Sequence, residues 1–269
     1  MKIVKLMGGL GNQMFQYAFG VLLGADVCYD TSWFDKCRNN KNITPREYEL
    51  DFWNINPRLT NKPKTRILGF IKVKKIIEHQ ANIYNPELLK IKSGVIQGYF
   101  QVAKYYGPVR AQLLQDFTPR NNPNAANKKI LDLIHTTNSV SLHIRRGDYV
   151  KLQQVHGLCD LDYYKRGIEY IANKIRKPHF FIFSDDTEWV LENLKIDFPY
   201  TVVDINHGRD SAWDMYLMMQ CKHNIIANSS FSWWGAWLNQ NPAKIVIAPL
   251  RWFADGTATD IVPQEWQRI

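Results

Sequence analysis

The chain has 269 residues and a mass of 31.4 kDa, with 45% hydrophobic and 22% charged residues. This is a globular composition, which excludes a disordered chain and gives enough length for a full core. No apolar stretch approaches the ~18 residues of a membrane-spanning helix, and the cysteines lie far apart without a paired motif. We therefore expect a cytoplasmic protein with reduced thiols.

The net charge of +9 is unevenly distributed along the chain. Residues 1–138 carry twice as many cations as acids, whereas residues 139–269 are close to balance. The cations are densest in residues 58–77, where they alternate with Ile and Phe and no acid intervenes. This run predicts either a solvated basic surface or a peripheral contact with a polyanion, such as the inner face of a membrane.

The first half of the chain begins with an expected strand at residues 2–8, a glycine-rich turn and a helix over residues 12–23. A second strand is expected at residues 25–30, and the pattern is less regular from 31 to 120. Residues 118–127 have the Pro- and Asn-rich composition of a linker. We therefore expect two domains, residues 1–120 and residues 121–269.

In the second half, short apolar runs alternate with segments of helical apolar spacing. The helices are expected at residues 161–177, 187–194, 211–221 and 230–239, and the strands at residues 139–145, 179–185, 200–204, 223–228 and 244–249. Such alternation predicts an α/β fold on an open, doubly wound parallel sheet. We expect two Rossmann-type lobes with a cleft between them, and ligands beyond the carboxyl ends of the strands.

The turn after the first strand combines glycines with side-chain amides. Gly9 and Gly11 allow a ligand to approach the backbone, and Asn12 and Gln13 place amides where sugar hydroxyls could bind. The turn lacks the Lys of a P-loop, and its dinucleotide fingerprint fails at the third glycine. Asp30 still lies where a ribose-binding acid would, so a nicotinamide-dependent oxidoreductase stays an alternative.

Two arginines follow the strand at residues 139–145. In the segment HIRRGD, strand alternation sends His143 and Arg145 to one face and Arg146 to the other. Fixed guanidinium groups suit the charge of a diphosphate. The alternative is that Arg146 pairs with Asp148 to fix the turn.

Acids follow the strand at residues 179–185. Asp185 and Asp186 precede Thr187, so they predict either metal ligation or an ordinary helix cap. No third ligand has suitable spacing, and we therefore predict no metal.

Two later segments carry polar residues in apolar surroundings. Asp214 is flanked by apolar residues, so it needs a partner and is a candidate for recognising a nucleobase. Ser229 and Ser230 open a helix, where hydroxyl and N–H groups bind phosphate or simply cap the helix. We assign the tryptophans of that helix to the core.

Four separate segments resemble, in order, the motifs of the α-1,2-fucosyltransferase family, glycosyltransferase family 11. They are GGLGNQMFQYA, HIRRGDYV, FSDD and DMYLMMQCKHNIIANSSFSWWGAWL, and the resemblance runs from residue 1 to about residue 250. It implies the two-lobed GT-B fold and metal-independent, inverting transfer of L-fucose from GDP-β-L-fucose to the 2-hydroxyl of a β-galactoside. Because the chain has no anchor segment, it resembles a bacterial, cytosolic member.

The resemblance also implies roles for particular residues. Arg145 holds the β-phosphate, His143 lies near the nucleoside, and Asp214 binds the guanine N1 and N2 hydrogens. Asn12 faces the fucose or the acceptor. Ser229 and Ser230 bind phosphate oxygens. From their own positions after the strands, we also assign Arg146, Gly9 and Gly11 to donor binding.

The proton acceptor is not fixed by the resemblance. Related α-1,6 enzymes have a glutamate where this chain has Gln153. Asp148 is the first candidate for the base, and a reaction without a dedicated base is the other. The acceptor is a galactose-containing glycan, free or lipid-linked, and no nucleic acid is expected. A non-catalytic basic protein that binds a polyanion or a membrane surface is a further alternative.

Overall fold

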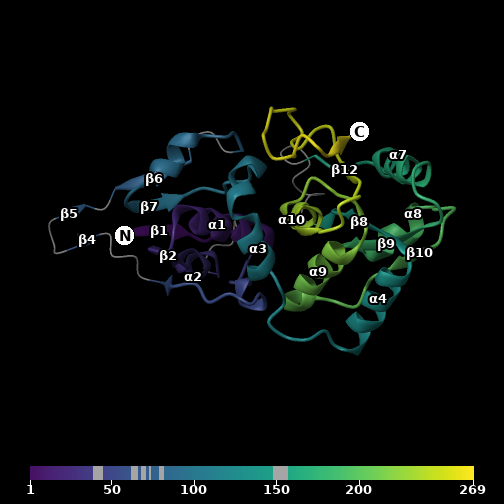
Figure 1. Cartoon of the computed structure of the whole chain (residues 1–269), viewed down its shortest axis with the longest axis horizontal. Coiled ribbons are helices and arrows are strands. Elements are labelled where there is room, and N and C mark those ends of the chain that lie inside the picture. The colour runs from purple at the N-terminus through teal and green to yellow at the C-terminus, as the bar shows by residue number, and fades with distance from the viewer. Residues whose placement is uncertain (39–44, 62–65, 68–70, 73, 79–81, 148–156) are drawn as a thin grey trace. The chain divides into compact units, whose positions relative to one another are not determined.

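The computed structural model describes residues 1–38, 45–61, 66–67, 71–72, 74–78, 82–147 and 157–269 (Figure 1). The chain divides into two compact units, residues 1–120 with 259–263 and residues 121–258 with 264–269. Residues 259–263, which the sequence assigned to the second domain, pack with the first unit. The cleft expected between the domains stays a prediction.

The first unit is built on a parallel sheet with strand order β3-β2-β1-β7-β6. Its strands are β1 (Lys2–Lys5), β2 (Val27–Asp30), β3 (Leu59–Thr60), β6 (Lys75–Ile77) and β7 (Gly94–Gln97). A separate antiparallel pair, β4 (Arg66–Ile67) and β5 (Ile71–Lys72), belongs to the basic run. Of the cations in that run, the structure describes the side chains of Arg58, Lys74 and Lys75, and those of Lys62, Lys64, Arg66 and Lys72 lie outside the described side chains.

Helix α1 (Leu10–Leu23) packs on β1 and β2 and is apolar on nearly all sides. Phe15 and Phe19 are fully buried, and the Phe19 ring stacks on Phe100 at a centroid distance of 4.0 Å. Burial of such rings supplies much of the stability of a small domain. Shorter helical segments complete the unit: α2 (Ser32–Arg38), η1 (Leu50–Phe52), η2 (Pro86–Lys90), η3 (Ala103–Tyr105), η4 (Gly107–Val109) and α3 (Arg110–Asp116).

The second unit contains a six-stranded parallel sheet with order β10-β9-β8-β11-β12-β13. Its strands are β8 (Asn138–Ile144), β9 (Pro178–Ser184), β10 (Tyr200–Val202), β11 (His223–Ile225), β12 (Val246–Ala248) and β13 (Gln267–Arg268). The α/β fold with parallel, doubly wound sheets is therefore confirmed. The edge strand β13 was not predicted, because two residues are too few to show a period.

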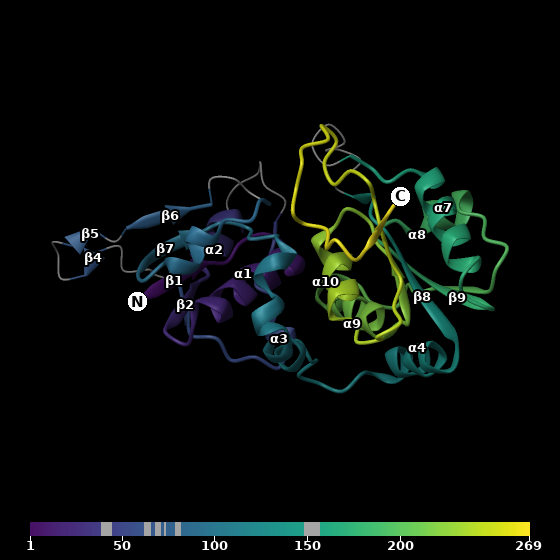
Figure 2. The same ribbon diagram turned by 45° about the horizontal axis from the view of Figure 1, so that its top comes forward.

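Helices cover both faces of this second sheet, as the two views show (Figures 1 and 2). Phe180 and Ile182 of β9 pack on one side with α7 and α8, and Phe181 and Phe183 pack on the other with α4 and α9. This alternation is what a doubly wound sheet requires. The helices are α4 (Ala125–Thr136), α7 (Leu161–Ala172), α8 (Thr187–Asn193), η5 (Gly208–Ser211), α9 (Ala212–Gln220) and α10 (Ser230–Leu238).

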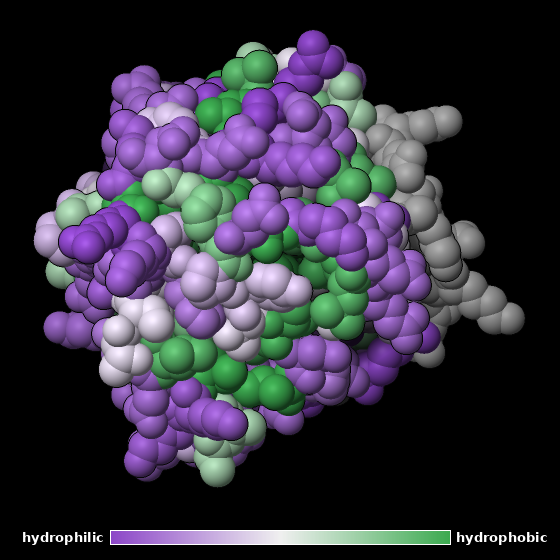
Figure 3. All heavy atoms as spheres, turned by 90° about the vertical axis from the view of Figure 1, so that its right-hand side faces the viewer, coloured by the Kyte–Doolittle hydropathy of each residue, from purple (hydrophilic) through white to green (hydrophobic). Residues whose placement is uncertain are grey.

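The tryptophans of α10 belong to the core, as predicted: Trp233 and Trp234 are fully buried. Polar side chains predominate on the face shown in Figure 3, and apolar residues form short patches among them. Within the described ranges, no helix is long and apolar enough to cross a membrane.

Candidate active site

The strand order of the second sheet creates a topological switch point between β8 and β11. From β8 the chain proceeds outward to β9 and β10, then returns to the other side of β8 as β11 and β12. The register pairs Ile225 of β11 with Leu142 of β8, so both strands end at the same edge. In open α/β sheets the ligand binds beyond this point. Arg145 and Arg146 follow β8 there, and Ser229 and Ser230 follow β11.

Arg145 is held by an aspartate on the neighbouring strand's end. Its Nη1 lies 2.9 Å from Oδ2 of Asp185, and Oδ1 of Asp185 accepts the backbone N–H of Arg146 at 2.9 Å. A Cβ on Gly147 would lie 2.4 Å from Oδ2 of Asp185, so a larger residue there would displace this carboxylate from Arg145. The Arg145 side chain keeps 24% of its surface exposed. Asp185 therefore fixes a guanidinium that a ligand can still reach.

Sequence reasoning missed this partnership, although strand register contains it. β8 and β9 pair with Ile144 opposite Ser184, which places the next residues, Arg145 and Asp185, side by side. Asp186 has a different role, because its carboxylate accepts the Trp189 N–H and caps α8. The cap interpretation is thus confirmed for Asp186.

The Arg146 side chain contacts the N-terminal part of α8. Its Nε lies 3.2 Å from Oδ2 of Asp186, and its guanidinium lies 3.7 Å from the centre of the Trp189 ring. The aspartate that fixes this arginine is therefore Asp186. The expected partner Asp148, also the first candidate for the base, lies outside the described residues, as does Gln153.

His143 is enclosed at the end of β8. It is 5% exposed, and its ring lies 5.7 Å from the Phe231 ring of α10. Burial and the charge of Arg145 lower the pKa of His143 to about 3, so the imidazole is neutral. Its Nδ1 has no partner among the described residues. His143 can therefore offer a hydrogen bond but no charge.

The N-terminus of α10 lies at the same sheet edge. Oγ of Ser229 accepts the Phe231 N–H at 3.3 Å, which confirms the capping alternative for this serine. Ser230 is half-buried and begins the helix. Asn228 is buried and donates to the Trp252 carbonyl at 3.0 Å, so it anchors the loop that precedes the helix.

Asp214 lies in the first turn of α9. Asn206 donates a hydrogen bond to its Oδ1 at 2.7 Å. Burial raises the pKa of Asp214 to about 7, the bond from Asn206 opposes that shift, and the charge of Asp204 adds to it. A carboxyl group that titrates near neutral pH at a sheet edge is typical of a functional site.

In the first unit, Asn12 lies beside the glycine turn after β1. Gly8 has a φ of +81°, and a Cβ there would lie 2.6 Å from Nδ2 of Asn12. Oδ1 of Asn12 accepts a hydrogen bond from Gln101 at 2.6 Å. Gly9 precedes α1 and has the Arg46 guanidinium nearby, and Gly11 is buried in the first turn. The sequence did not indicate Gln101 or Arg46, because both belong to irregular segments.

Two interpretations from the sequence need correction. Gln13 is fully buried and donates to the carbonyls of Gly8 and Glu47 at 2.9 and 2.8 Å, so its amide holds the loop instead of facing a sugar. Asp30 is 2% exposed and accepts the Ser32 N–H at 2.9 Å. Its carboxylate orders the start of α2 and is not available to a ribose, which removes the residue behind the nicotinamide alternative.

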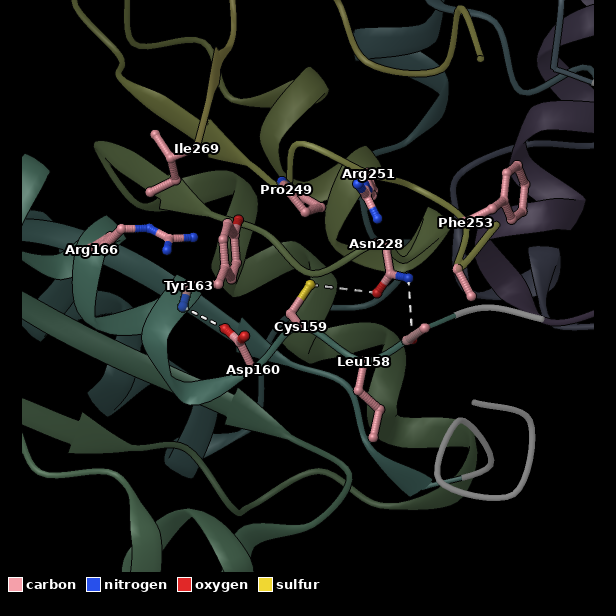
Figure 4. A pocket seen from close by; sticks show the side chains of 12 residues that line it. Leu158, Cys159, Asp160, Tyr163, Arg166, Asn228, Pro249, Arg251, Phe253 and Ile269 are labelled. Carbon is pink, nitrogen blue, oxygen red and sulfur yellow. Dashed lines mark hydrogen bonds between the residues drawn. The ribbon is translucent and has the colours of Figure 1, made fainter. Parts of the chain in front are cut away.

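A pocket of about 450 Å³ lies in the second unit, at the carboxyl ends of β11 and β12 and the start of α7 (Figure 4). Asp160 caps α7 beside it by accepting the Tyr163 N–H at 2.7 Å. Arg166 and Arg251 add positive charge to its lining. The described lining includes Asn228, which directly precedes Ser229 in sequence, but none of the predicted site residues.

The fold of most of the chain is similar to that of the α-1,6-fucosyltransferase NodZ in a structure co-crystallized with GDP. The match has a TM-score of 0.50 at 11% identity and covers 87% of this chain and 90% of the other. At this identity the likeness shows the fold alone, and it agrees with the predicted GT-B-like architecture.

Sequence relatives match over nearly the full length. An Escherichia coli alpha-1,2-colitosyltransferase is 36% identical over 287 residues, which cover 99% of this chain and 98% of the relative. The E. coli O-antigen biosynthesis glycosyltransferase WbnK is 35% identical over 300 residues, covering 97% and 98%. The family model described as glycosyl transferase family 11 matches residues 1–269. The resemblance of the four motifs is thus confirmed, and the chain belongs to glycosyl transferase family 11.

Proposed function

We propose that this chain transfers L-fucose from GDP-β-L-fucose to the 2-hydroxyl of a β-galactoside, with inversion and without a metal. The observation that carries the proposal is the edge at the switch point, where Arg145 is fixed by Asp185 and α10 begins at Ser229 and Ser230. A guanidinium and helix N–H groups at one sheet edge suit a diphosphate. Family membership and the GDP bound by the structurally similar NodZ also support it.

The proposed chemistry breaks the bond between the fucosyl anomeric carbon and the β-phosphate oxygen. The acceptor oxygen forms the new bond from the opposite face, and its proton leaves to a base or to water. Negative charge grows on the departing GDP, and Arg145 and the N–H groups at the start of α10 stabilise it. His143, Arg146 and Asp214 serve the donor in this proposal, and Asn12, Gly9 and Gly11 border the sugar.

Asp148 stays our proposed proton acceptor. It follows residues 145–147 directly in sequence. In this role its carboxylate takes the proton from the acceptor hydroxyl, on the face opposite the departing GDP. The second proposal is that proton loss to solvent suffices, because an oxocarbenium-like transition state needs little help from a base.

GDP-colitose is the second candidate donor. The observation that favours it is the 36% identity, over 99% of this chain, to an alpha-1,2-colitosyltransferase. Colitose is L-fucose without its 3-hydroxyl, so both donors present the same nucleotide and leaving group. Discrimination between them depends on the sugar-facing residues and leaves the roles of Arg145 and Asp214 unchanged.

The test offers GDP-fucose and GDP-colitose, separately and in competition, with free and lipid-linked β-galactosides as acceptors. We expect a fucosylated product whose linkage analysis gives an α-1,2 bond. Transfer from GDP-colitose alone would replace the first donor by the second. Transfer from neither donor, or another linkage, would contradict the proposal.

A further inference from the structure

Two buried asparagines are connected to Asp214 by hydrogen bonds. Asn127 of α4 is fully buried, and Asn206, which follows β10, is 7% exposed. Each donates a side-chain N–H to the other's Oδ1 at 2.9 Å. Asn206 uses its remaining N–H for Oδ1 of Asp214 at 2.7 Å. Three elements that are separate in sequence therefore meet at one carboxylate.

The hydrogen-bond pattern leaves the amides one orientation. The second N–H of Asn127 donates to Oδ1 of Asn124, the residue that caps α4, at 3.2 Å. Every side-chain N–H of the pair is thus used. A flip of Asn206 would set its oxygen against the Asp214 oxygen and its nitrogen against a nitrogen of Asn127. The pair is consequently a rigid donor aimed at Asp214.

The other oxygen of Asp214 faces a different environment. Within the described part of the chain, Oδ2 has no hydrogen-bond partner, and Asp214 is half-buried. Guanine presents two adjacent donors, N1–H and the N2 amino group, which a carboxylate edge can accept together, whereas hypoxanthine keeps only N1–H. A carboxylate held in one rotamer with an accessible edge is what such recognition needs.

We propose that Asn127 and Asn206 are positioning residues that make Asp214 selective for guanine. This inference rests on the proposed function, because it requires a guanine nucleotide at the switch-point edge. Asn206 fixes the direction of the carboxylate, and Asn127 fixes Asn206. Neither asparagine touches the nucleotide in this arrangement, so both act through Asp214.

The electrostatics of the site agree with this geometry. Burial raises the pKa of Asp214, and the hydrogen bond from Asn206 favours the ionised form that accepts guanine hydrogens. Asp204, after β10, opposes ionisation. Helix α4 presents the neutral Asn127 to this network, and α10, which also packs on α9, has no charged residue.

The test measures dissociation constants of GDP and IDP by calorimetry for the complete wild-type chain and three variants. Asn206→Ala removes the donor to Asp214, and Asn127→Ala removes only its support. Asn138→Ala is the matched control, since Asn138 also uses its amide in the second unit, at the other end of β8. Circular dichroism and the unfolding midpoint establish that each variant is folded.

We expect wild type to prefer GDP over IDP by about tenfold or more, since a hydrogen bond to a charged group is at stake. In Asn206→Ala the dissociation constant of IDP should exceed that of GDP by no more than about threefold. Asn127→Ala should give an intermediate ratio of the two constants, and Asn138→Ala should keep the wild-type ratio. If Asn206→Ala does not fold, the Asn127→Ala variant tests the positioning role: an intermediate ratio supports it, and the wild-type ratio contradicts it.

The outcomes separate the inference from the function on which it rests. Folded variants that keep the wild-type GDP/IDP ratio, including variants that bind both nucleotides equally less well, would overturn the positioning role. A wild-type chain that does not bind GDP would contradict the proposed function itself, and the inference with it.

Discussion

In both units the first three strands run outward from one central strand of a parallel sheet. The strands on the other side follow in a different order, and the side chains after the strands differ in chemistry. In the first unit the amide of Asn12, after β1, is bonded to Gln101, and the Arg46 guanidinium lies near Gly9. In the second unit the switch point lies between β8 and β11, and paired charges dominate, with Arg145 on Asp185 and Arg146 on Asp186. Amides suit neutral hydroxyls, whereas fixed guanidinium groups suit phosphates.

In both units the sheet determines where a ligand binds, and the residues after each strand determine which ligand binds. Changes at the carboxyl edge of the second sheet should therefore affect binding of the nucleotide and departure of the leaving group. Changes at the first edge should instead affect the sugar acceptor. Variants at the two edges can therefore be sorted by which kinetic constant they alter.

The largest effect is expected for Arg145→Ala. Loss of one preorganised donor to the leaving group should lower kcat by about a hundredfold or more. Steady-state kinetics with saturating donor and acceptor measure it. Arg38→Ala is the control, because Arg38 also pairs with an aspartate, Asp35 at 3.5 Å, but is exposed on α2. Near-normal turnover of Arg145→Ala would contradict the proposal that Arg145 stabilises the departing GDP.

The next largest effect is a pH dependence of GDP binding. Asp214 has its pKa raised to about 7 by burial, and it must be ionised to accept guanine hydrogens. Affinity should therefore be full above pH 7 and fall by about tenfold per pH unit well below it. Titration of wild type and Asp214→Asn at several pH values separates this ionisation from that of the diphosphate. Equal pH profiles for the two proteins would show that ionisation of Asp214 does not control GDP binding.

A smaller effect is expected for Asp185→Asn. Arg145 keeps its charge in this variant but loses its ionic brace, so kcat should fall by about fivefold. Asp35→Asn removes the charge of an exposed pair and should leave kcat unchanged. A rate for Asp185→Asn equal to wild type would show that the turn holds Arg145 without the carboxylate.

The smallest effect is expected at the first edge. Gln101→Ala removes the 2.6 Å hydrogen bond to Asn12, and one neutral hydrogen bond corresponds to about a threefold rise in the acceptor KM. The dissociation constant of GDP should not change. Gln112→Ala, which loses an exposed bond to Asp116 on α3, is the control. A weaker GDP affinity in Gln101→Ala would contradict the assignment of separate roles to the two edges.

Much of the second unit was predictable because its elements are long and periodic. The seven-residue strands β8 and β9 match the predicted ones within one residue, and their ends located Arg145 and the adjacent acids. The first unit was harder to predict. Its strands β3 and β6 have two and three residues, which are too few to show a period in the sequence.

The partnerships within the site were not predictable from local patterns. The Arg145–Asp185 pair depends on strand register, and the Asn127–Asn206 pair joins residues 79 positions apart. Gln13 was misjudged because an amide after a glycine turn suits a ligand and a loop carbonyl equally well. Because Gln13 is buried, its amide binds the loop carbonyls. This burial is not visible in the sequence.

Amide hydrogen exchange with and without saturating GDP tests whether the nucleotide binds at the charged carboxyl edge of the second sheet. We predict slower exchange in peptides that contain Arg145, Asp214 and the Ser229–Ser230 start of α10, and little change in the peptide that contains Asn12. Protection confined to the glycine turn of the first unit, with none at those segments, would contradict the assignment of the nucleotide to the charged edge.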